Sequence, residues 1–214
     1  MSNTTNEMIS EVSKYLKLAS SQDIPQERQK VLQAVIDYVQ SRLAVGHVPQ
    51  LHFICTHNSR RSQLSQVWAQ IAAHHHGIGV VCYSGGVEVT ACHPHTVDAL
   101  RRAGLTVLQR GEENPTYLAQ YASDEAPVIL YSKVFDAELQ PQEEFAAIMT
   151  CAHADENCPF TPGADCRLPV RYQDPKVSDG TPEQAAVYDA RSLQIASEML
   201  YIFAAVADGR ANLQ

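Results

Sequence analysis

The chain has 214 residues, of which 45% are hydrophobic and 19% are charged, and its formal net charge is −8. This composition fits one compact globular domain and excludes collagen-like, disordered and coiled-coil proteins. No apolar run approaches the roughly 20 residues that span a bilayer, and the first residues lack the regions of a signal peptide. We therefore expect a cytoplasmic protein without a membrane partner, and its acidic balance argues against nucleic acid as a partner.

Two helices are predicted in the first fifty residues. Apolar residues recur there at helical spacing, and Asp23 with Pro25 favours the start of the second helix. Gly46 and Pro49 favour its end. We treat residues 1–48 as a helical N-terminal extension.

Strands and helices alternate in the next part of the chain. A short apolar run at residues 51–55 predicts a strand, and a polar loop and a helix through residues 64–71 follow it. A second predicted strand at residues 80–83 is followed by a helix at residues 94–103. Such alternation predicts a parallel sheet covered by helices on both faces.

The second half of the chain is less regular. Strands are predicted at residues 128–131 and 145–150, and residues 152–180, with four prolines, are expected to form a long functional loop. A capping sequence at residues 181–184 then opens a final helix that Gly209 ends.

Cys55 stands at the end of a predicted buried strand, and five residues separate it from Arg61. Backbone N–H groups of such a loop and of the following helix favour an anion, and Arg61 can bind two of its oxygen atoms. The same positive field lowers the pKa of a thiol, so Cys55 is a candidate nucleophile; the alternative is a buried structural cysteine. The predicted oxyanion-binding residues are Thr56, His57, Asn58, Ser59, Arg60, Arg61 and Ser62. Ser62 is expected to donate to the thiolate, and Asn58 to adopt a left-handed turn.

The segment Cys55-Thr-His-Asn-Ser-Arg-Arg-Ser62 resembles the phosphate loop of the low-molecular-weight protein tyrosine phosphatases and of the related thioredoxin-coupled arsenate reductases. The resemblance implies an α/β three-layer sandwich, with a four-stranded parallel sheet flanked by helices, as a phosphatase-like domain over residues 49–214. Asp174-Pro175 matches the pair that supplies the general acid in the phosphatases. The resemblance also allows a potassium ion near Asn58 and Ser84, with no tightly bound cofactor.

Two positions in this loop bear on the anion. His57 stands where the family usually has glycine, and its ring is expected either to crowd the anion or to donate to it. Arg60 is expected to add positive charge at the mouth of the site.

Cys151 and Cys158 are separated by six residues, and Pro159 follows them. This segment resembles the redox segment of the reductases, which implies that Cys151 attacks the adduct on Cys55, that Cys158 then attacks Cys151, and that thioredoxin reduces the product. A zinc site remains an alternative, with ligands Cys151, His153, Cys158 and Cys166, although the spacing lacks the short gap of a zinc knuckle. Cys82, Cys92 and Cys166 match no thiol of the family and are assigned to packing.

Three functional hypotheses follow. The first is reduction of arsenate to arsenite, with thioredoxin as the reductant and side phosphatase activity. The second is hydrolysis of phosphotyrosine or aryl phosphate, in which Cys55, Arg61 and Asp174 act alone. The third is a redox-sensing or metal-binding module without turnover.

Overall fold

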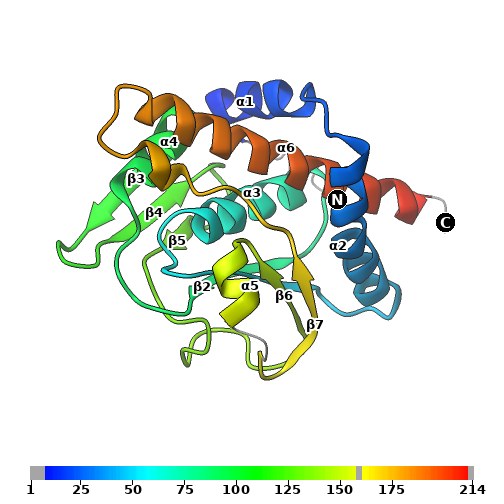
Figure 1. Ribbon diagram of the computed structural model, residues 1–214. Coiled ribbons are helices and arrows are strands. Elements are labelled where there is room, and N and C mark those ends of the chain that lie inside the picture. Colours follow the sequence, from blue (N-terminus) through cyan, green and yellow to red (C-terminus); the bar gives the residue numbers. More distant parts are fainter. Residues whose placement is uncertain (1–7, 158–160, 212–214) are drawn as a thin grey trace.

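The computed structural model describes residues 8–157 and 161–211, with a parallel sheet at the centre and most helices packed on one face of it (Figure 1). None of the helices in these residues has both the length and the apolar character that a membrane span requires.

The central sheet has four parallel strands in the order β2, β1, β6, β7, as the resemblance implied. The two inner strands, β1 (Gln50–Cys55) and β6 (Phe145–Met149), are almost fully buried, which explains their continuous apolar sequences. β2 (Val81–Gly86) lies on one side of β1, and its last residue, Gly86, pairs with Cys55. The carboxyl ends of β1 and β2 therefore meet at one edge of the sheet.

The fourth strand is β7 (Ala164–Pro169), in a region that the sequence pattern assigned to a long loop. That assignment is wrong, because residues 152–180 also contain helix α5 (Ala152–Asn157) and the 3-10 helix η1 (Pro175–Ser178). β7 is an edge strand whose residues are mostly half-exposed, so its sequence shows no apolar alternation. Pairing with the buried strand β6 creates it.

A separate three-stranded antiparallel sheet contains β3 (Thr106–Arg110), β4 (Thr116–Gln120) and β5 (Val128–Leu130). The strand predicted at residues 128–131 is therefore present, but it belongs to this second sheet. β3 and β4 were not predicted, because β3 is mostly exposed and the residues of β4 alternate between buried and half-buried, so neither has a continuous apolar sequence.

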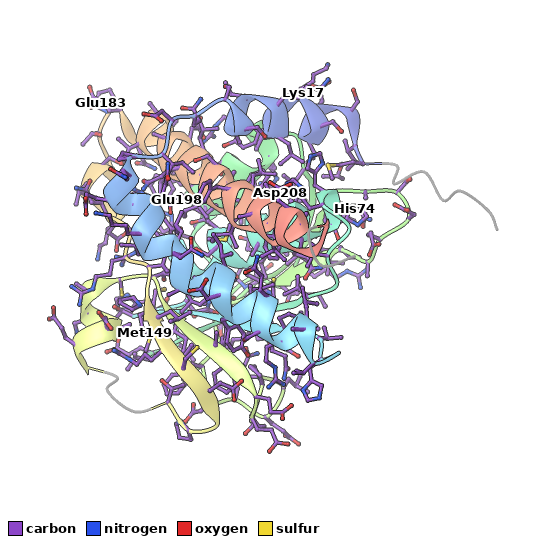
Figure 2. All side chains as sticks on the ribbon, turned by 90° about the vertical axis from the view of Figure 1, so that its right-hand side faces the viewer. Lys17, His74, Met149, Glu183, Glu198 and Asp208 are labelled. Atoms are coloured by element: carbon purple, nitrogen blue, oxygen red, sulfur yellow. The ribbon has the colours of Figure 1, made fainter. Side chains whose placement is uncertain are left out.

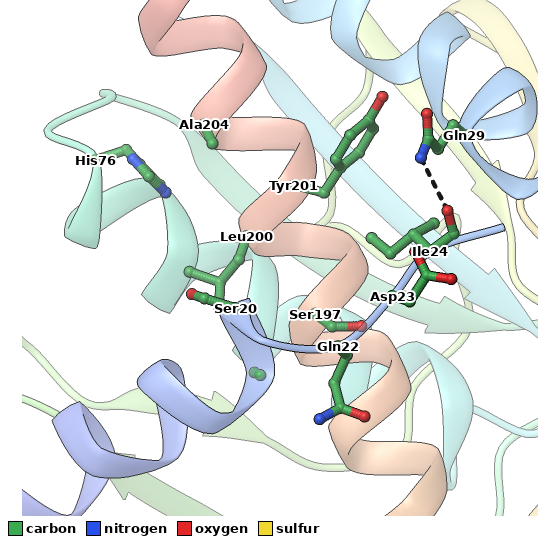
Figure 3. Close-up of a pocket in the computed structure, with 11 residues that line it drawn as sticks. Ser20, Gln22, Asp23, Ile24, Gln29, His76, Ser197, Leu200, Tyr201 and Ala204 are labelled. Carbon is green, nitrogen blue, oxygen red and sulfur yellow. Dashed lines mark hydrogen bonds between the residues drawn. The ribbon is translucent and has the colours of Figure 1, made fainter. Parts of the chain in front are cut away.

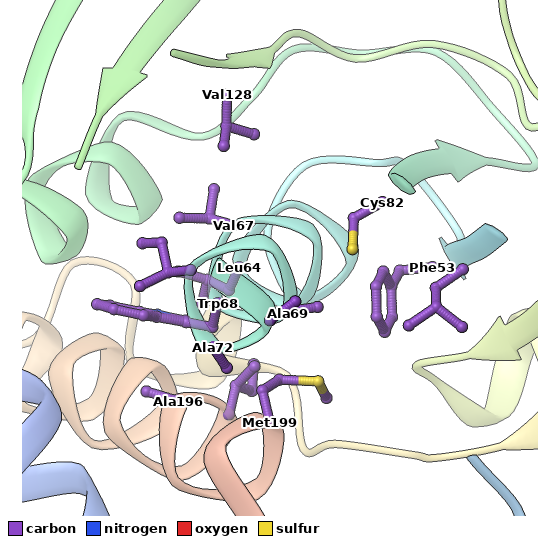
Figure 4. Close-up of a cluster of buried hydrophobic side chains, with 14 of the residues drawn as sticks. Phe53, Leu64, Val67, Trp68, Ala69, Ala72, Cys82, Val128, Ala196 and Met199 are labelled. Atoms are coloured by element: carbon purple, nitrogen blue, oxygen red, sulfur yellow. The ribbon is translucent and has the colours of Figure 1, made fainter. Parts of the chain in front are cut away.

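The long C-terminal helix α6 (Gln184–Ala211) contacts four other helices, α1 (Ser10–Ser20), α2 (Gln26–Ala44), α3 (Arg61–His75) and α4 (Pro94–Arg102) (Figure 1). Trp68 of α3 belongs to the same buried cluster as Met199 of α6 (Figure 4). Its ring stacks on Tyr15 at 5.0 Å, and its N–H donates to Ser192 Oγ at 2.9 Å. The opposite face of the sheet is covered by α5 and by loop side chains.

The N-terminal helices share this core. Val12 of α1 and Leu32 of α2 are fully buried in the same apolar cluster as the sheet residues Leu51 and Phe53. The views in Figures 1 and 2 place α2 alongside α6, where Arg28 forms a 2.7 Å ion pair with the buried carboxylate of Glu198. The extension predicted over residues 1–48 therefore contributes to the main core rather than to a core of its own.

We expect Leu32→Ala to lower the free energy of unfolding by about 2–5 kcal/mol, because it removes a fully buried side chain. Val31→Ala is the matched control, since Val31 is the neighbouring residue and its side chain is 38% exposed. Urea denaturation of both variants measures the difference. Equal stabilities would show that α2 is not part of the cooperative core.

Candidate active site

Cys55 ends the central strand β1, and its side chain is 3% exposed. A loop over residues 56–60 leads from it into α3, which begins at Arg61. The predicted order of strand, loop and helix is thus present, and the loop occupies the edge where β1 and β2 end.

The carbonyl groups of the loop all face outward. Each carbonyl from Thr56 to Arg60 accepts a hydrogen bond, and the donors are Glu88 N, Ser132 Oγ, Gln63 Nε2, His93 N and Leu64 N. Within the part of the chain that the structure describes, no backbone N–H from Thr56 to Arg61 donates a hydrogen bond. A row of free N–H groups beside a thiol is a binding site for an oxyanion.

Asn58 turns the loop. Its φ angle of 45° lies in the left-handed region, as predicted, and its side chain is fully buried. Its amide donates to Ser62 Oγ at 2.8 Å, and Ser62 Oγ lies 3.1 Å from Cys55 Sγ. β2 ends in glycine because the loop passes close by: a Cβ atom on Gly86 would lie 2.7 Å from Asn58 N.

Arg61 and Asp174 meet at this site from distant parts of the chain. Arg61 Nη2 lies 2.5 Å from Asp174 Oδ2, and its Nη1 donates to the Tyr172 carbonyl at 3.2 Å. Arg61 Nε is buried, and no group of the described residues forms a hydrogen bond with it. A buried unpaired donor is costly, so this nitrogen is suited to an oxyanion beside Cys55.

The N-terminal turn of η1 positions Asp174. Its Oδ1 accepts a hydrogen bond from Lys176 N at 3.1 Å, which leaves Oδ2 toward Arg61. Asp174 is 30% exposed, so the carboxyl group is accessible to a proton from solvent.

The other predicted side chains of the loop have structural partners. Arg60 binds Asp179 at 2.9 Å and Tyr188 Oη at 2.6 Å, so its charge is compensated. The His57 ring is 42% exposed and lies 3.4 Å from the Glu88 carboxylate. The Thr56 hydroxyl contacts Cys151 Sγ at 3.5 Å, and the Ser59 hydroxyl donates to the Ala91 carbonyl at 2.6 Å. Contact of these residues with an anion would therefore come from their backbone N–H groups.

Cys151 lies next to this loop, at the end of β6 and the start of α5. Its side chain is 1% exposed and belongs to the same small apolar cluster as Cys55. The Thr56 hydroxyl lies between Cys151 Sγ, at 3.5 Å, and His153 Nδ1, at 3.3 Å. Cys158, its predicted redox partner, lies outside the described residues.

Ion pairs hold α5 in place. The buried carboxylate of Asp155 binds Arg167 of β7 at 2.6 Å and also pairs with Arg171. The helix that follows Cys151 is thereby fixed to the edge strand.

The other cysteines of the described residues are Cys82, Cys92 and Cys166. Cys82 and Cys92 are buried, and burial raises the pKa of both, to about 12 for Cys92. Cys166 is half-exposed on β7. Residues 8–157 and 161–211 contain no group of three or more His, Cys, Asp or Glu side chains placed to hold a metal ion, and of the proposed zinc ligands Cys158 lies beyond them.

The sequence analysis assigned no role to Lys133 or Ser132, and it named His153 only as a possible zinc ligand. Lys133 Nζ lies 3.3 Å from both Asn58 Oδ1 and Ser84 Oγ, the two residues where a potassium ion was expected. A lysine within the apolar stretch that follows Val128 was the available signal, since a lysine in such a context is seldom left without a partner. These residues give a role to the segment near residues 121–140.

Two cavities differ in their relation to this site. A surface cavity of about 300 Å³ borders the loop and is lined by His57, Arg60, Cys92 and Lys176, among others. Another, of about 350 Å³, lies between the α1–α2 connection and α6, where Asp23 and Tyr201 line it (Figure 3). None of the predicted site residues lines the second cavity.

Comparison with known proteins shows which protein families this chain resembles. A model of the family described as low molecular weight phosphotyrosine protein phosphatase matches residues 50–117. The chain is 27% identical over 154 residues to the arsenate reductase of Bacillus licheniformis, an alignment that covers 72% of this chain and 94% of that protein. It is 26% identical over 134 residues to the arsenate reductase of Bacillus subtilis, covering 63% and 79% of the two chains.

Two solved structures match this chain at low structural similarity and low sequence identity. A low molecular weight phosphotyrosine phosphatase from Vibrio cholerae has a TM-score of 0.49 and 12% identity, over 77% of this chain and 98% of that chain. A thioredoxin-dependent arsenate reductase from Corynebacterium glutamicum has a TM-score of 0.41 and 18% identity, over 91% and 84%. The family resemblance that the sequence motifs indicated is confirmed by the sequence comparisons, and with it the assignment as an enzyme.

We expect Arg61→Lys to weaken the binding of inorganic phosphate by about tenfold or more, because lysine cannot donate in a fork to two oxygen atoms. Arg60→Lys is the matched control, since the Arg60 guanidinium contacts Asp179 and Tyr188 instead. Protection of Cys55 from alkylation by iodoacetamide measures the affinity. Equal affinities in the two variants would contradict the assignment of Arg61 as the oxyanion clamp.

Proposed function

We propose that this chain, a relative of the arsenate reductases and of the low molecular weight phosphotyrosine protein phosphatases, reduces arsenate to arsenite with thioredoxin as the reductant. The observation that carries this proposal is the position of Cys151. Hydrolysis of a phosphate ester does not require a second thiol beside the nucleophile, whereas reduction of arsenate requires one to supply electrons.

The first step forms a bond between sulfur and arsenic. The free N–H groups of the loop and Arg61 bind the arsenate oxygens, and the Cys55 thiolate attacks arsenic. A hydroxyl group leaves as water with the proton of Asp174, whose carboxyl group lies beside Arg61. Arsenic remains As(V) in this adduct.

The second step transfers two electrons. The thiolate of Cys151 attacks Cys55 Sγ, so a disulfide forms between them and the bond between sulfur and arsenic breaks. Its electron pair stays on arsenic, which departs as As(III) in arsenite. The shared burial of the two cysteines in one small cluster supports this step.

The proton of Cys151 has a path out of this cluster. Because the Thr56 hydroxyl contacts both Cys151 Sγ and His153 Nδ1, it can accept from the thiol and donate to the imidazole. His153 lies at the surface and can release the proton to water. We assign His153 as the proton acceptor for the second nucleophile.

The third step requires α5 to change. Cys158 attacks Cys151 and releases Cys55 as a thiolate. The six residues of α5 lie between the two cysteines in the sequence and rise by about 9 Å along the helix axis, whereas a disulfide needs a Cα separation under about 7 Å. Part of α5 must therefore unwind, and the ion pairs of Asp155 oppose that unwinding. Thioredoxin then reduces the disulfide between Cys151 and Cys158.

Hydrolysis of aryl phosphate is the second candidate function. The contact between Arg61 and Asp174 favours it, because it places a general acid next to the group that binds the oxyanion. The two functions share the first step, so a reductase with this site is expected to hydrolyse aryl phosphate as a side activity.

The first experiment measures arsenate-dependent oxidation of NADPH in the presence of thioredoxin and thioredoxin reductase. Cys151→Ser and Cys158→Ser are expected to abolish turnover while aryl phosphate hydrolysis persists, because hydrolysis needs only Cys55, Arg61 and Asp174. Cys166→Ser is the matched control, as a thiol outside the relay, and is expected to retain both activities.

Other outcomes point to the other hypotheses. Hydrolysis that depends on Cys55 and Asp174, without arsenate turnover, would identify a phosphatase. The absence of both activities from a folded protein would favour the redox-sensing or metal-binding module.

We expect His153→Ala to slow arsenate turnover by about tenfold or more, within the usual contribution of a positioned proton acceptor. Hydrolysis of aryl phosphate serves as the internal control, because it does not use Cys151. A parallel loss of both activities would indicate a structural role for His153 and would contradict the proton path.

A further inference from the structure

Lys133 is a buried cation behind the anion-binding loop. Its side chain is 8% exposed, and Nζ lies 4.5 Å from the centre of the Tyr131 ring. Nζ donates to Asn58 Oδ1 and Ser84 Oγ at 3.3 Å and to the Tyr131 carbonyl at 3.2 Å. All of these partners are neutral, and no carboxylate of the described ranges forms an ion pair with Lys133.

A buried ammonium group such as that of Lys133 is stabilised by a compensating negative charge nearby. Burial lowers the pKa of Lys133 to about 8, an effect that negative charge on Cys92 and Cys55 opposes. The amine is therefore mostly an ammonium ion at pH 7. His52 faces the same cation, and burial together with Lys133 lowers its pKa to about 3, so His52 remains neutral. Because burial keeps Cys92 a thiol, the Cys55 thiolate and a bound oxyanion are the available counter-charges.

Lys133 also sets the direction of a hydrogen-bond chain. Its backbone N–H, at 3.2 Å, and its Nζ both donate to Asn58 Oδ1, so that atom must be the amide oxygen. The Asn58 NH₂ group then faces Ser62 Oγ and donates to it at 2.8 Å. Ser62 has its own hydrogen left for Cys55 Sγ, 3.1 Å away. A donor aimed at the sulfur stabilises the thiolate over the thiol.

We propose that Lys133 is a built-in cation of this site, which holds Asn58 and, through Asn58 and Ser62, directs a hydrogen bond to the Cys55 thiolate. This inference rests on the proposed function. It replaces the expectation of a potassium ion near Asn58 and Ser84, because the ammonium group already contacts both oxygen atoms. Lys133 is thus a positioning residue, separated from the reacting atoms by two side chains.

Two substitutions separate the charge from the space that it fills. Lys133→Met removes the charge but keeps most of the volume, and Lys133→Ala leaves a gap lined by Asn58 Oδ1, Ser84 Oγ and the Tyr131 carbonyl. Lys176→Ala is the control, because it removes one exposed positive charge that borders the same loop. Each variant is tested for alkylation of Cys55 by iodoacetamide at pH 7, for affinity toward inorganic phosphate, and for thermal stability.

Both Lys133 variants are expected to alkylate about tenfold more slowly and to bind phosphate more weakly, as expected for the loss of a nearby opposite charge. Potassium chloride or methylammonium chloride, compared with tetramethylammonium chloride at equal ionic strength, is expected to restore Lys133→Ala but not Lys133→Met. The wild type and Lys176→Ala are expected to be insensitive to the cation.

The possible failures are distinguishable. Folded Lys133 variants that alkylate and bind phosphate as the wild type does would overturn the role of Lys133 alone. A wild type that responds to potassium as strongly as Lys133→Ala would also overturn it. A wild type whose Cys55 neither reacts nor is protected by phosphate would instead overturn the proposed function.

Discussion

Five consecutive carbonyl groups, from Thr56 to Arg60, are bound from outside the anion-binding loop, and this outward pull turns the N–H groups of the same peptides toward Cys55. A peptide plane is rigid, so fixing its oxygen fixes its hydrogen on the opposite side. The loop is therefore held in one geometry by the rest of the fold, so the binding proposed for it would cost little reorganisation. The left-handed turn at Asn58 and the glycine at the end of β2 follow from the same requirement, because both let the loop close over the end of the sheet.

Charge is distributed unevenly around this loop in a protein whose formal net charge is −8. Three of its basic side chains have acidic partners: His57 lies beside Glu88, Arg60 beside Asp179, and Arg61 beside Asp174. The carboxylates orient these side chains and compensate the positive charges of Arg60 and Arg61. Within residues 8–157 and 161–211, the hydrogen-bond partners of Lys133 are all neutral, and because Lys133 is buried its charge is weakly screened by solvent.

The rest of the fold supports the two edges of this site. Arg28 of α2 pairs with Glu198 of α6 and lies over the ring of Tyr172, whose carbonyl accepts from Arg61. The N-terminal helices thus connect to Arg61 through one aromatic residue. On the other edge, Asp155 joins the short helix α5 to β7, and this ion pair fixes the position of the helix that follows Cys151.

The sequence by itself determined the order of β1, loop and α3, the left-handed turn at Asn58, and the candidate roles of Cys55 and Arg61. These features depend on contacts within eight consecutive residues, where local propensity and hydrogen bonding act directly. Only the tertiary structure decided the strand β7, the second sheet, the place of Lys133, and the contact of Thr56 with Cys151. Each of these joins segments far apart in the chain, and such pairing depends on how the core closes rather than on any periodic pattern of residues.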